Sequence, residues 1–214
     1  MTPEALAHLS KQCRVMRRLI RAHGPCTLVA DRRRTPFESL VRAVAHQQLN
    51  GTAAETILRR FRALFPGKRF PSAKQLAEVD DDALRAAGFS WAKIASLRDI
   101  AAKTLDGTVP GSRAIYSMAD AEIIERLTQV RGVGRWTVEM LLIFKLGRPD
   151  ILPIDDFGVR NGFRVAFGLA ELPKPKELLP HGDRWRPHGT TAAWYLWRAA
   201  DAAKVQPPLR GVNA

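Results

Sequence analysis

The sequence predicts an all-α protein of about ten helices. Most segments open with a residue type that caps helix N-termini, and apolar side chains then recur at helical spacing. Glycine follows many of these segments, as is typical of helix C-termini. No segment shows the alternation of a β-strand, and there is no regular repeat. Hydrophobic residues make up 46% of the 214 residues, which is enough for a substantial core.

The first well-marked helix begins at Pro36. Thr35 is its predicted N-cap, Pro36 takes the first helical position, and Glu38 fits a capping box. The apolar pattern breaks at residues 46–51 (HQQLNG) and restarts at once, with residues 52–55 (TAAE) matching a second capping box. We therefore expect residues 46–51 to form a short corner between two helices, with unusually long polar side chains.

Further capping residues divide the rest of the chain into helices. Ser72, Asp80 and Ser90 each precede a helical segment, and Gly88 and Gly107 follow two of these segments. A loosely helical stretch and an irregular tail are expected at residues 171–187 and 205–214. The later helices are expected at residues 121–130, 135–146, 156–167 and 190–203.

The composition restricts the possible functions. Lys and Arg number 34 against 21 Asp and Glu, and a formal charge of +13 predicts a polyanionic partner, most simply nucleic acid. Mere solubility is the alternative explanation of this charge. The two cysteines, Cys13 and Cys26, cannot supply the ligands of an iron–sulfur cluster and indicate free thiols in a reducing compartment. No His/Cys/Asp cluster has the spacing of a transition-metal site.

Neither a secretion signal nor a stretch of about 20 apolar residues is present in the sequence. We therefore expect a soluble intracellular protein, in the cytoplasm or nucleoid, with no membrane partner.

Residues 127–136 (LTQVRGVGRW) predict two helices joined by a tight turn. Glycines 132 and 134 lack a Cβ, so the backbone can turn sharply and approach a phosphate, while N–H groups of the next helix point at that phosphate. An ordinary turn that merely needs glycine is the alternative, but the basic flanks favour a phosphate site. The predicted phosphate-contacting residues are Arg131, Gly132, Val133, Gly134, Arg135 and Thr137.

Two adjacent aspartates, Asp155 and Asp156, start a helix about twenty residues further on. Capping explains only one of them. A carboxylate at a helix N-terminus stays ionised because the helix dipole favours negative charge. Such an anion suits a substrate that becomes cationic during reaction, as a deoxyribose does when the bond to its base breaks. It can also orient an attacking water.

These motifs resemble those of the helix–hairpin–helix DNA glycosylase superfamily. The hairpin, the form PIDDFGVR and the upstream AVAHQQLNGTAA are similar to its alkylpurine branch, the 3-methyladenine DNA glycosylases II, over roughly residues 36–200. The resemblance implies a two-lobed all-helical fold with a cleft between the lobes. It also implies flipping of alkylated purines, of the 3-methyladenine and 7-methylguanine type, out of double-stranded DNA and their excision by N-glycosidic hydrolysis in base excision repair.

The resemblance also suggests a domain plan for residues 1–214 as a single unit. One lobe is expected at roughly 36–115 and another, with the hairpin and the acid, at roughly 116–170. The terminal segments, 1–35 and 171–205, would pack as parts of these lobes. The alternative is that the two ends of the chain pack together as one lobe and the middle forms the other.

The resemblance assigns catalysis to Asp156. Asp155 is the alternative catalytic residue, but its simpler interpretation is that it caps the helix. Trp136 stands where strand-cutting members carry a lysine nucleophile, and an indole cannot form a Schiff base, so we expect a monofunctional hydrolase. We also expect a monomer. No cofactor is expected, although hairpin carbonyls of this superfamily can hold a monovalent cation when DNA is bound.

A glycosylase of this kind must flip its target base and fill the gap. By resemblance Gln48 fills the gap, whereas an ordinary soluble corner is the alternative. A cationic alkylpurine is attracted to aromatic faces. The other residues predicted at the corner are Gln47, Leu49 and Asn50, with minor-groove contacts from Gln47 and Asn50, and those predicted in the base pocket are Trp136, Trp197, Tyr195 and Met140, with Trp194 in the core.

Two other functions fit parts of this pattern. A non-catalytic helix–hairpin–helix DNA-binding protein would keep the hairpin and the basic charge without needing Asp156. A glycosylase for oxidised or deaminated bases would differ only in its base pocket.

Overall fold

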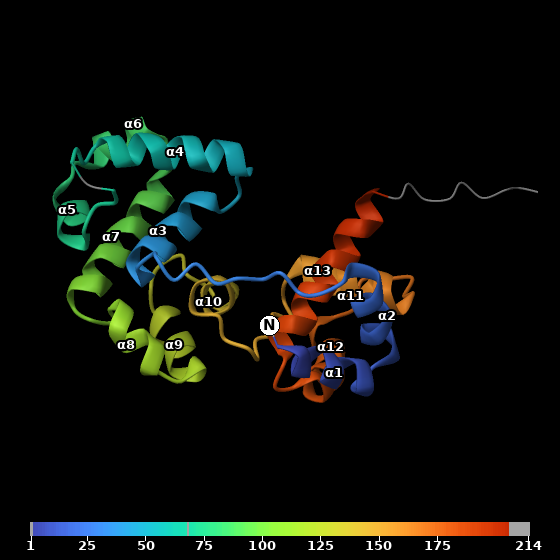
Figure 1. The fold of residues 1–214 in the computed structure, drawn as a ribbon. Helices are drawn as coiled ribbons and strands as arrows, with labels where there is room; N and C mark the ends of the chain where they lie inside the picture. Colours follow the sequence, from blue (N-terminus) through green and yellow to red (C-terminus); the bar gives the residue numbers. More distant parts are fainter. Residues whose placement is uncertain (1, 68, 206–214) are drawn as a thin grey trace, which may run out of the picture. The chain divides into compact units, whose positions relative to one another are not determined.

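A computed structural model describes residues 2–67 and 69–205 of the chain. These residues form thirteen α-helices and one π-helical turn, with no strand among them (Figure 1). The predicted all-α class is confirmed, although the helices are more numerous than expected because short segments such as α8 carry weak capping signals. Of the predicted irregular tail, residues 206–214 lie outside the described residues.

The chain divides into two compact units. The central unit is residues 30–146, and the terminal unit combines residues 1–29 with 147–214. This division differs from the predicted lobes at 36–115 and 116–170, since the hairpin belongs to the central unit and Asp156 to the terminal unit. It matches the alternative in which the chain ends pack together, because helices near both ends share one core.

The terminal unit is built around the contact between its two central helices, α11 and α13, which lie side by side (Figure 1). Gly162 of α11 makes this contact possible, because a Cβ there would overlap the carbonyl oxygen of Leu196 in α13. Leu9 and Met16 from the N-terminal helices are fully buried in the same core. The helices of this unit are α1 (Pro3–Gln12), α2 (Arg14–His23), α11 (Phe157–Phe167), α12 (Pro175–Trp185) and α13 (Gly189–Val205).

The central unit packs around α7 (Trp91–Leu105), whose Leu97 and Ile100 are fully buried. α7 contacts α3, α5 and α6, and Phe61 of α4 lies edge-on to Phe89 in the same core. The other helical elements of this unit are α3 (Pro36–His46), α4 (Gly51–Ala63), α5 (Ala73–Glu78), α6 (Asp81–Ala87), α8 (Ser112–Ser117), α9 (Asp120–Leu127), α10 (Arg135–Leu141) and the π-helical turn η1 (Leu142–Leu146).

Most predicted helix starts are confirmed by their capping bonds. Thr35 Oγ1 accepts from Glu38 N at 3.0 Å. Ser72 and Gln75 form a complete capping box, in which each side chain accepts from the backbone N–H of the other residue. The start predicted at Thr52 is wrong. Asn50 is the N-cap of α4, because its Oδ1 accepts from Ala53 N at 2.8 Å and the helix already begins at Gly51. Asparagine is among the strongest N-caps, so the earlier start is favoured.

Among the helices in the described part of the chain, none is both long and apolar enough to cross a bilayer.

The close approach of α11 and α13 gives a first prediction. Gly162→Ala is expected to lower the free energy of unfolding by about 3 kcal/mol, because a backbone carbonyl cannot move aside for the new methyl group. Gly51→Ala is the matched control. A Cβ at Gly51 meets open space, so that variant is expected to stay within about 1 kcal/mol of the parent. Urea denaturation of both variants measures the difference, and equal stabilities would contradict this account of the packing.

Candidate functional site

Asp156 lies at the start of α11 and is itself the N-cap of that helix. Its Oδ1 accepts from Val159 N at 2.8 Å and from Trp197 Nε1 at 2.8 Å. The interpretation of Asp155 as the cap is therefore wrong. The Asp156 N–H closes a turn onto Pro153 O at 3.1 Å and Phe157 begins the helix, which leaves Asp155 exposed in the preceding turn.

Trp197 of α13 fixes the orientation of the Asp156 carboxylate. Its partly exposed indole lies against Gly158, where a Cβ would be 2.8 Å from the Trp197 Cδ1 atom. The glycine after Phe157 thus leaves room for the ring, and the ring N–H reaches the carboxylate. Hydrogen bonds from a backbone N–H and an indole N–H stabilise negative charge on this oxygen. The result is a partly exposed carboxylate whose direction is set from two helices.

Tyr195, predicted in the base pocket, is instead a core residue. It is 0% exposed, and its hydroxyl donates to Gly24 O at 2.8 Å. Burial, with a contribution from Cys26, raises the pKa of Tyr195 to about 12. Residues two apart on a helix point about 200° apart, so Tyr195 and Trp197 cannot both face the same side of α13. Trp194 is buried, as expected.

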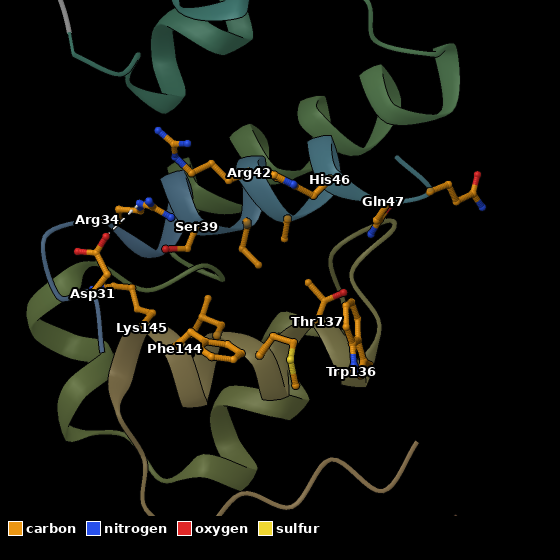
Figure 2. Close-up of a pocket in the computed structure, with 15 residues that line it drawn as sticks. Asp31, Arg34, Ser39, Arg42, His46, Gln47, Trp136, Thr137, Phe144 and Lys145 are labelled. Atoms are coloured by element: carbon orange, nitrogen blue, oxygen red, sulfur yellow. Dashed lines mark ion pairs between the residues drawn. The ribbon is translucent and has the colours of Figure 1, made fainter. Parts of the chain in front are cut away.

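The central unit contains a cavity of about 550 Å³ between α3 and the continuous helix formed by α10 and η1 (Figure 2). Trp136, Met140 and Phe144 line one wall at intervals of four residues, and Ser39 and His46 line the wall opposite. The Trp136 side of this wall is accessible, since that residue is 46% exposed. The structure thus brings the predicted Trp136 and Met140 together.

Sequence reasoning missed Phe144, which is also a cavity-lining aromatic residue. The four-residue spacing after Trp136 and Met140 was the available signal, because residues at i, i+4 and i+8 share one helix face.

The other end of the cavity is charged. Arg34 Nε lies 3.3 Å from Asp31 Oδ2, and hydrogen bonds from Arg33 hold the pKa of Asp31 below its ordinary value. The buried Lys145 Nζ donates to Tyr116 Oη at 3.2 Å and lies 5.2 Å from the centre of that ring. The cavity therefore has an aromatic wall at one side and, at its other end, two basic side chains that already have partners, Arg34 with Asp31 and Lys145 with Tyr116.

The two hairpin glycines have different roles. Gly132 has a φ of +75°, and a Cβ there would clash with the Ser96 Oγ atom of α7, so both conformation and packing require glycine. Gly134 is the N-cap of α10 with a φ of −86°, and a Cβ there would meet nothing within 4 Å. Gly132 therefore shapes the turn, whereas Gly134 leaves the start of α10 open.

The other predicted hairpin residues divide into exposed and buried. Arg131 and Arg135 are exposed; the Arg131 N–H donates to Asp99 Oδ2 at 2.7 Å, and Arg135 Nε lies 2.9 Å from Glu139 Oε1. Val133 is buried beneath the turn. Thr137 is only 6% exposed and its side chain lines the cavity, so a phosphate contact at this residue could come only from its backbone N–H. The α-helical rotation after Arg135 turns the side chain inward.

The corner at residues 47–50 is held in an unusual conformation. Gln48 has a φ of +57°, the left-handed region that a residue with a Cβ seldom occupies, and its side chain is exposed at the cavity. Leu49 is 40% exposed. The other two side chains are engaged within the unit, since Gln47 Nε2 donates to Gly132 O at 2.8 Å and Asn50 caps α4. Only Gln48 and Leu49 thus have the freedom that gap filling requires.

No group of three or more His, Cys, Asp or Glu residues in the described ranges, 2–67 and 69–205, could hold a metal ion.

Comparisons with known proteins agree with this fold and these motifs. A family model described as "HhH-GPD superfamily base excision DNA repair protein" matches residues 41–187. The chain is 43% identical over 178 residues to DNA-3-methyladenine glycosylase 1 of Schizosaccharomyces pombe, covering 83% of this chain and 78% of that protein.

Two solved structures are similar to the chain as well. The structure of a Schizosaccharomyces pombe 3-methyladenine DNA glycosylase in complex with abasic DNA has a TM-score of 0.84 at 40% identity, covering 95% of this chain and 100% of that one. A DNA-3-methyladenine glycosidase from Bacillus halodurans has a TM-score of 0.86 at 33% identity, covering 96% and 92%. The chain belongs to the HhH-GPD superfamily of base excision DNA repair proteins, and the predicted resemblance to its alkylpurine branch is confirmed.

The different roles of the two hairpin glycines can be separated by substitution. Gly132→Ala is expected to lower the free energy of unfolding by about 1–3 kcal/mol, because the alanine would need a positive φ and would clash with Ser96. Gly134→Ala should cost less than about 1 kcal/mol, the difference between glycine and alanine as an N-cap. Thermal and urea unfolding of the two variants compares them, and a larger loss at Gly134 would reverse the assignment.

Proposed function

We propose that the chain is a monofunctional DNA glycosylase that excises alkylated purines from double-stranded DNA by hydrolysing the N-glycosidic bond in base excision repair. Relatives that are 33–43% identical bear the names of 3-methyladenine DNA glycosylases or glycosidases. The observation that carries the proposal is the Asp156 carboxylate, which α11 and the Trp197 indole hold in one orientation at a helix N-terminus.

The chemistry needs little more than this carboxylate. A purine alkylated at N3 or N7 carries a positive charge, so it leaves as a neutral base once the C1′–N bond breaks. Positive charge then develops on the deoxyribose, and the fixed Asp156 anion stabilises it electrostatically. Water adds to C1′ and loses its proton to solvent, with the carboxylate orienting the attacking oxygen. Because the leaving group is good, no strong general acid is required.

A carboxylate held in this way argues against a purely DNA-binding protein. An aspartate that serves only as a helix cap needs the bond from Val159 N. The additional bond from Trp197, and the glycine at position 158 that leaves room for the indole, serve the orientation of the carboxylate. A monofunctional reaction follows from Trp136, since the residue after the hairpin has no amine to attack the sugar.

The aromatic wall of the central unit suits the flipped base. Trp136 is the exposed indole of this wall, and a cationic purine stacked on it would gain roughly 0.5–2 kcal/mol from cation–π attraction. Met140 and Phe144 extend the same apolar surface, and a cavity of about 550 Å³ has ample room for a methylated purine. The corner supplies Gln48, with Leu49 beside it, to fill the gap that the base leaves.

The hairpin is proposed to hold the DNA backbone. The open backbone at Gly134 and the exposed guanidinium groups of Arg131 and Arg135 present donors to a phosphate. Carbonyl oxygens of such a turn can also coordinate a monovalent cation, and a bound cation would add positive charge beside a phosphate. We further propose a monomer that acts in the cytoplasm or nucleoid.

The decisive experiment compares the two adjacent aspartates. Asp156→Asn keeps an oxygen that can accept from Val159 and Trp197, so the fold should be preserved, but it removes the negative charge. Base release should fall by about 100-fold or more, while binding to duplex DNA stays within about threefold. Asp155→Asn is the matched control and should retain release. Free bases are quantified by chromatography from methylated DNA, and binding is measured by fluorescence anisotropy.

Two outcomes of this experiment would overturn the proposal. Undiminished release by Asp156→Asn would remove the catalytic assignment. Release of 8-oxoguanine, uracil or hypoxanthine in preference to 3-methyladenine by the parent enzyme would change the substrate class.

The hairpin assignment predicts a specific salt effect. Arg131→Gln should reduce the slope of log affinity against log salt concentration by about 1, because one phosphate contact is lost. The fold should be unaffected, since the bond to Asp99 comes from the Arg131 backbone. Lys74→Gln on α5 removes the same charge from an exposed pair with Glu78 and serves as the control. Identical slopes for all three proteins would show that Arg131 does not contact a phosphate.

A further inference from the structure

Three residues on one face of α7 contact both the corner and the hairpin of the central unit. Lys93, Ser96 and Asp99 are spaced by three residues, so they form a stripe along the helix. Lys93 contacts the corner, whereas Ser96 and Asp99 contact the hairpin. A single helix therefore carries the contacts of two loops that are more than 80 residues apart in the sequence.

Lys93 is the contact on the corner side. Its Nζ donates to Ala45 O and to Gln47 O, each at 2.9 Å. These oxygens lie where α3 ends, and the last carbonyls of a helix have no partner within it and favour a positive charge. Partial burial lowers the pKa of the Lys93 ammonium.

The hairpin side completes a closed set of contacts. Ser96 fills the space beside Gly132, where an added Cβ would lie 2.4 Å from Ser96 Oγ, and Asp99 Oδ2 accepts from Arg131 N at 2.7 Å. The corner and hairpin also contact each other directly, because Gln47 Nε2 donates to Gly132 O. α7, the corner and the hairpin thus form a ring of three mutual contacts, and Gln47 takes part in two of them.

The residue that this ring holds is the one with the strained backbone. Gln48 follows Gln47 directly and has a φ of +57°. A residue with a Cβ keeps such a conformation only where the surrounding structure holds it there. At Gln48 this role falls to the two hydrogen bonds of the preceding residue, one accepted by the Gln47 carbonyl from Lys93 and one donated by the Gln47 side chain to Gly132 O. Without them, the corner could relax and turn the Gln48 side chain elsewhere.

We propose that Lys93 is a positioning residue for base flipping, which holds the corner against the hairpin so that Gln48 is presented to the duplex in a fixed direction. This inference rests on the proposed glycosylase function. A lysine that only capped α3 would affect stability and would alter excision from every substrate alike. A positioning residue matters most where a paired base must be displaced, because flipping is easier for an unpaired base.

The test uses Lys93→Met, which keeps a side chain of similar length and removes the donor and its charge. The substrates are a duplex with one 7-methylguanine opposite cytosine and the same strand opposite an abasic-site analogue. Single-turnover excision from the paired duplex should fall by about tenfold or more, and excision from the unpaired one by less than about threefold. Lys103→Met, which removes a charge from the last turn of the same helix, should leave both rates within about twofold.

A second variant tests the ring through its other contact. Gln47→Met removes the bond to Gly132 O, and it should show the same dependence on base pairing. If the two bonds hold one corner, the double variant should lose much less than the product of the two single effects, because either loss alone frees the corner. Gln47→Met also carries the test if circular dichroism shows that Lys93→Met does not fold.

The possible results separate this inference from the function on which it rests. Equal loss on both substrates, no loss on either, or fully multiplicative effects of the two substitutions would each overturn the role of Lys93. A parent enzyme that releases neither 7-methylguanine from these duplexes nor 3-methyladenine from methylated DNA would instead refute the proposed function.

Discussion

The chemistry proposed for this protein depends on holding one negative charge in a fixed direction. A solvated aspartate samples several rotamers and would approach a developing cation only part of the time. Asp156 is restricted because Val159 N and Trp197 Nε1 donate to the same carboxylate oxygen. Preorganisation of this kind is effective because the protein has oriented the charge before the reaction begins.

That restriction is a product of helix packing in the terminal unit. Trp197 reaches the carboxylate because α13 approaches α11 closely, and two glycines of α11 allow the approach. Because Gly162 has no side chain, the backbone of α13 can pack against it at Leu196, and the missing side chain of Gly158 leaves space for the Trp197 indole. The α11 sequence DFGVRNGF thus carries the acid and both spaces that its partner helix needs. A side chain at either glycine would separate the helices and move the indole away from Asp156.

Sequence patterns predicted what is local and missed what depends on distant contacts. The all-α class, most helix starts and the hairpin follow from capping and spacing within a few residues, whereas the choice of Asp156 over Asp155 came from the family resemblance. Tyr195 was misplaced, and the burial of the Thr137 side chain was not foreseen, because a residue on a helix can face either side and only the packing of other helices decides which side is buried. The corner residues were recognised, but the engagement of Gln47 and Asn50 and the role of Lys93 were not. Lys93 meets the corner across more than 40 residues, and no local pattern encodes such a contact.

The same distinction between local and distant effects explains how a strongly basic chain can use the anion proposed for catalysis. The charge of +13 acts over the whole surface and attracts a polyanion without regard to sequence. The carboxylate acts over a few ångströms, and its effect depends on orientation more than on net charge. Because a carboxylate repels phosphates, its cost to DNA binding is lowest when it is single and fixed. The arrangement of Asp156 and Trp197 meets the second condition, because two hydrogen bonds hold one carboxylate oxygen, whereas the exposed Asp155 adds another negative charge beside it.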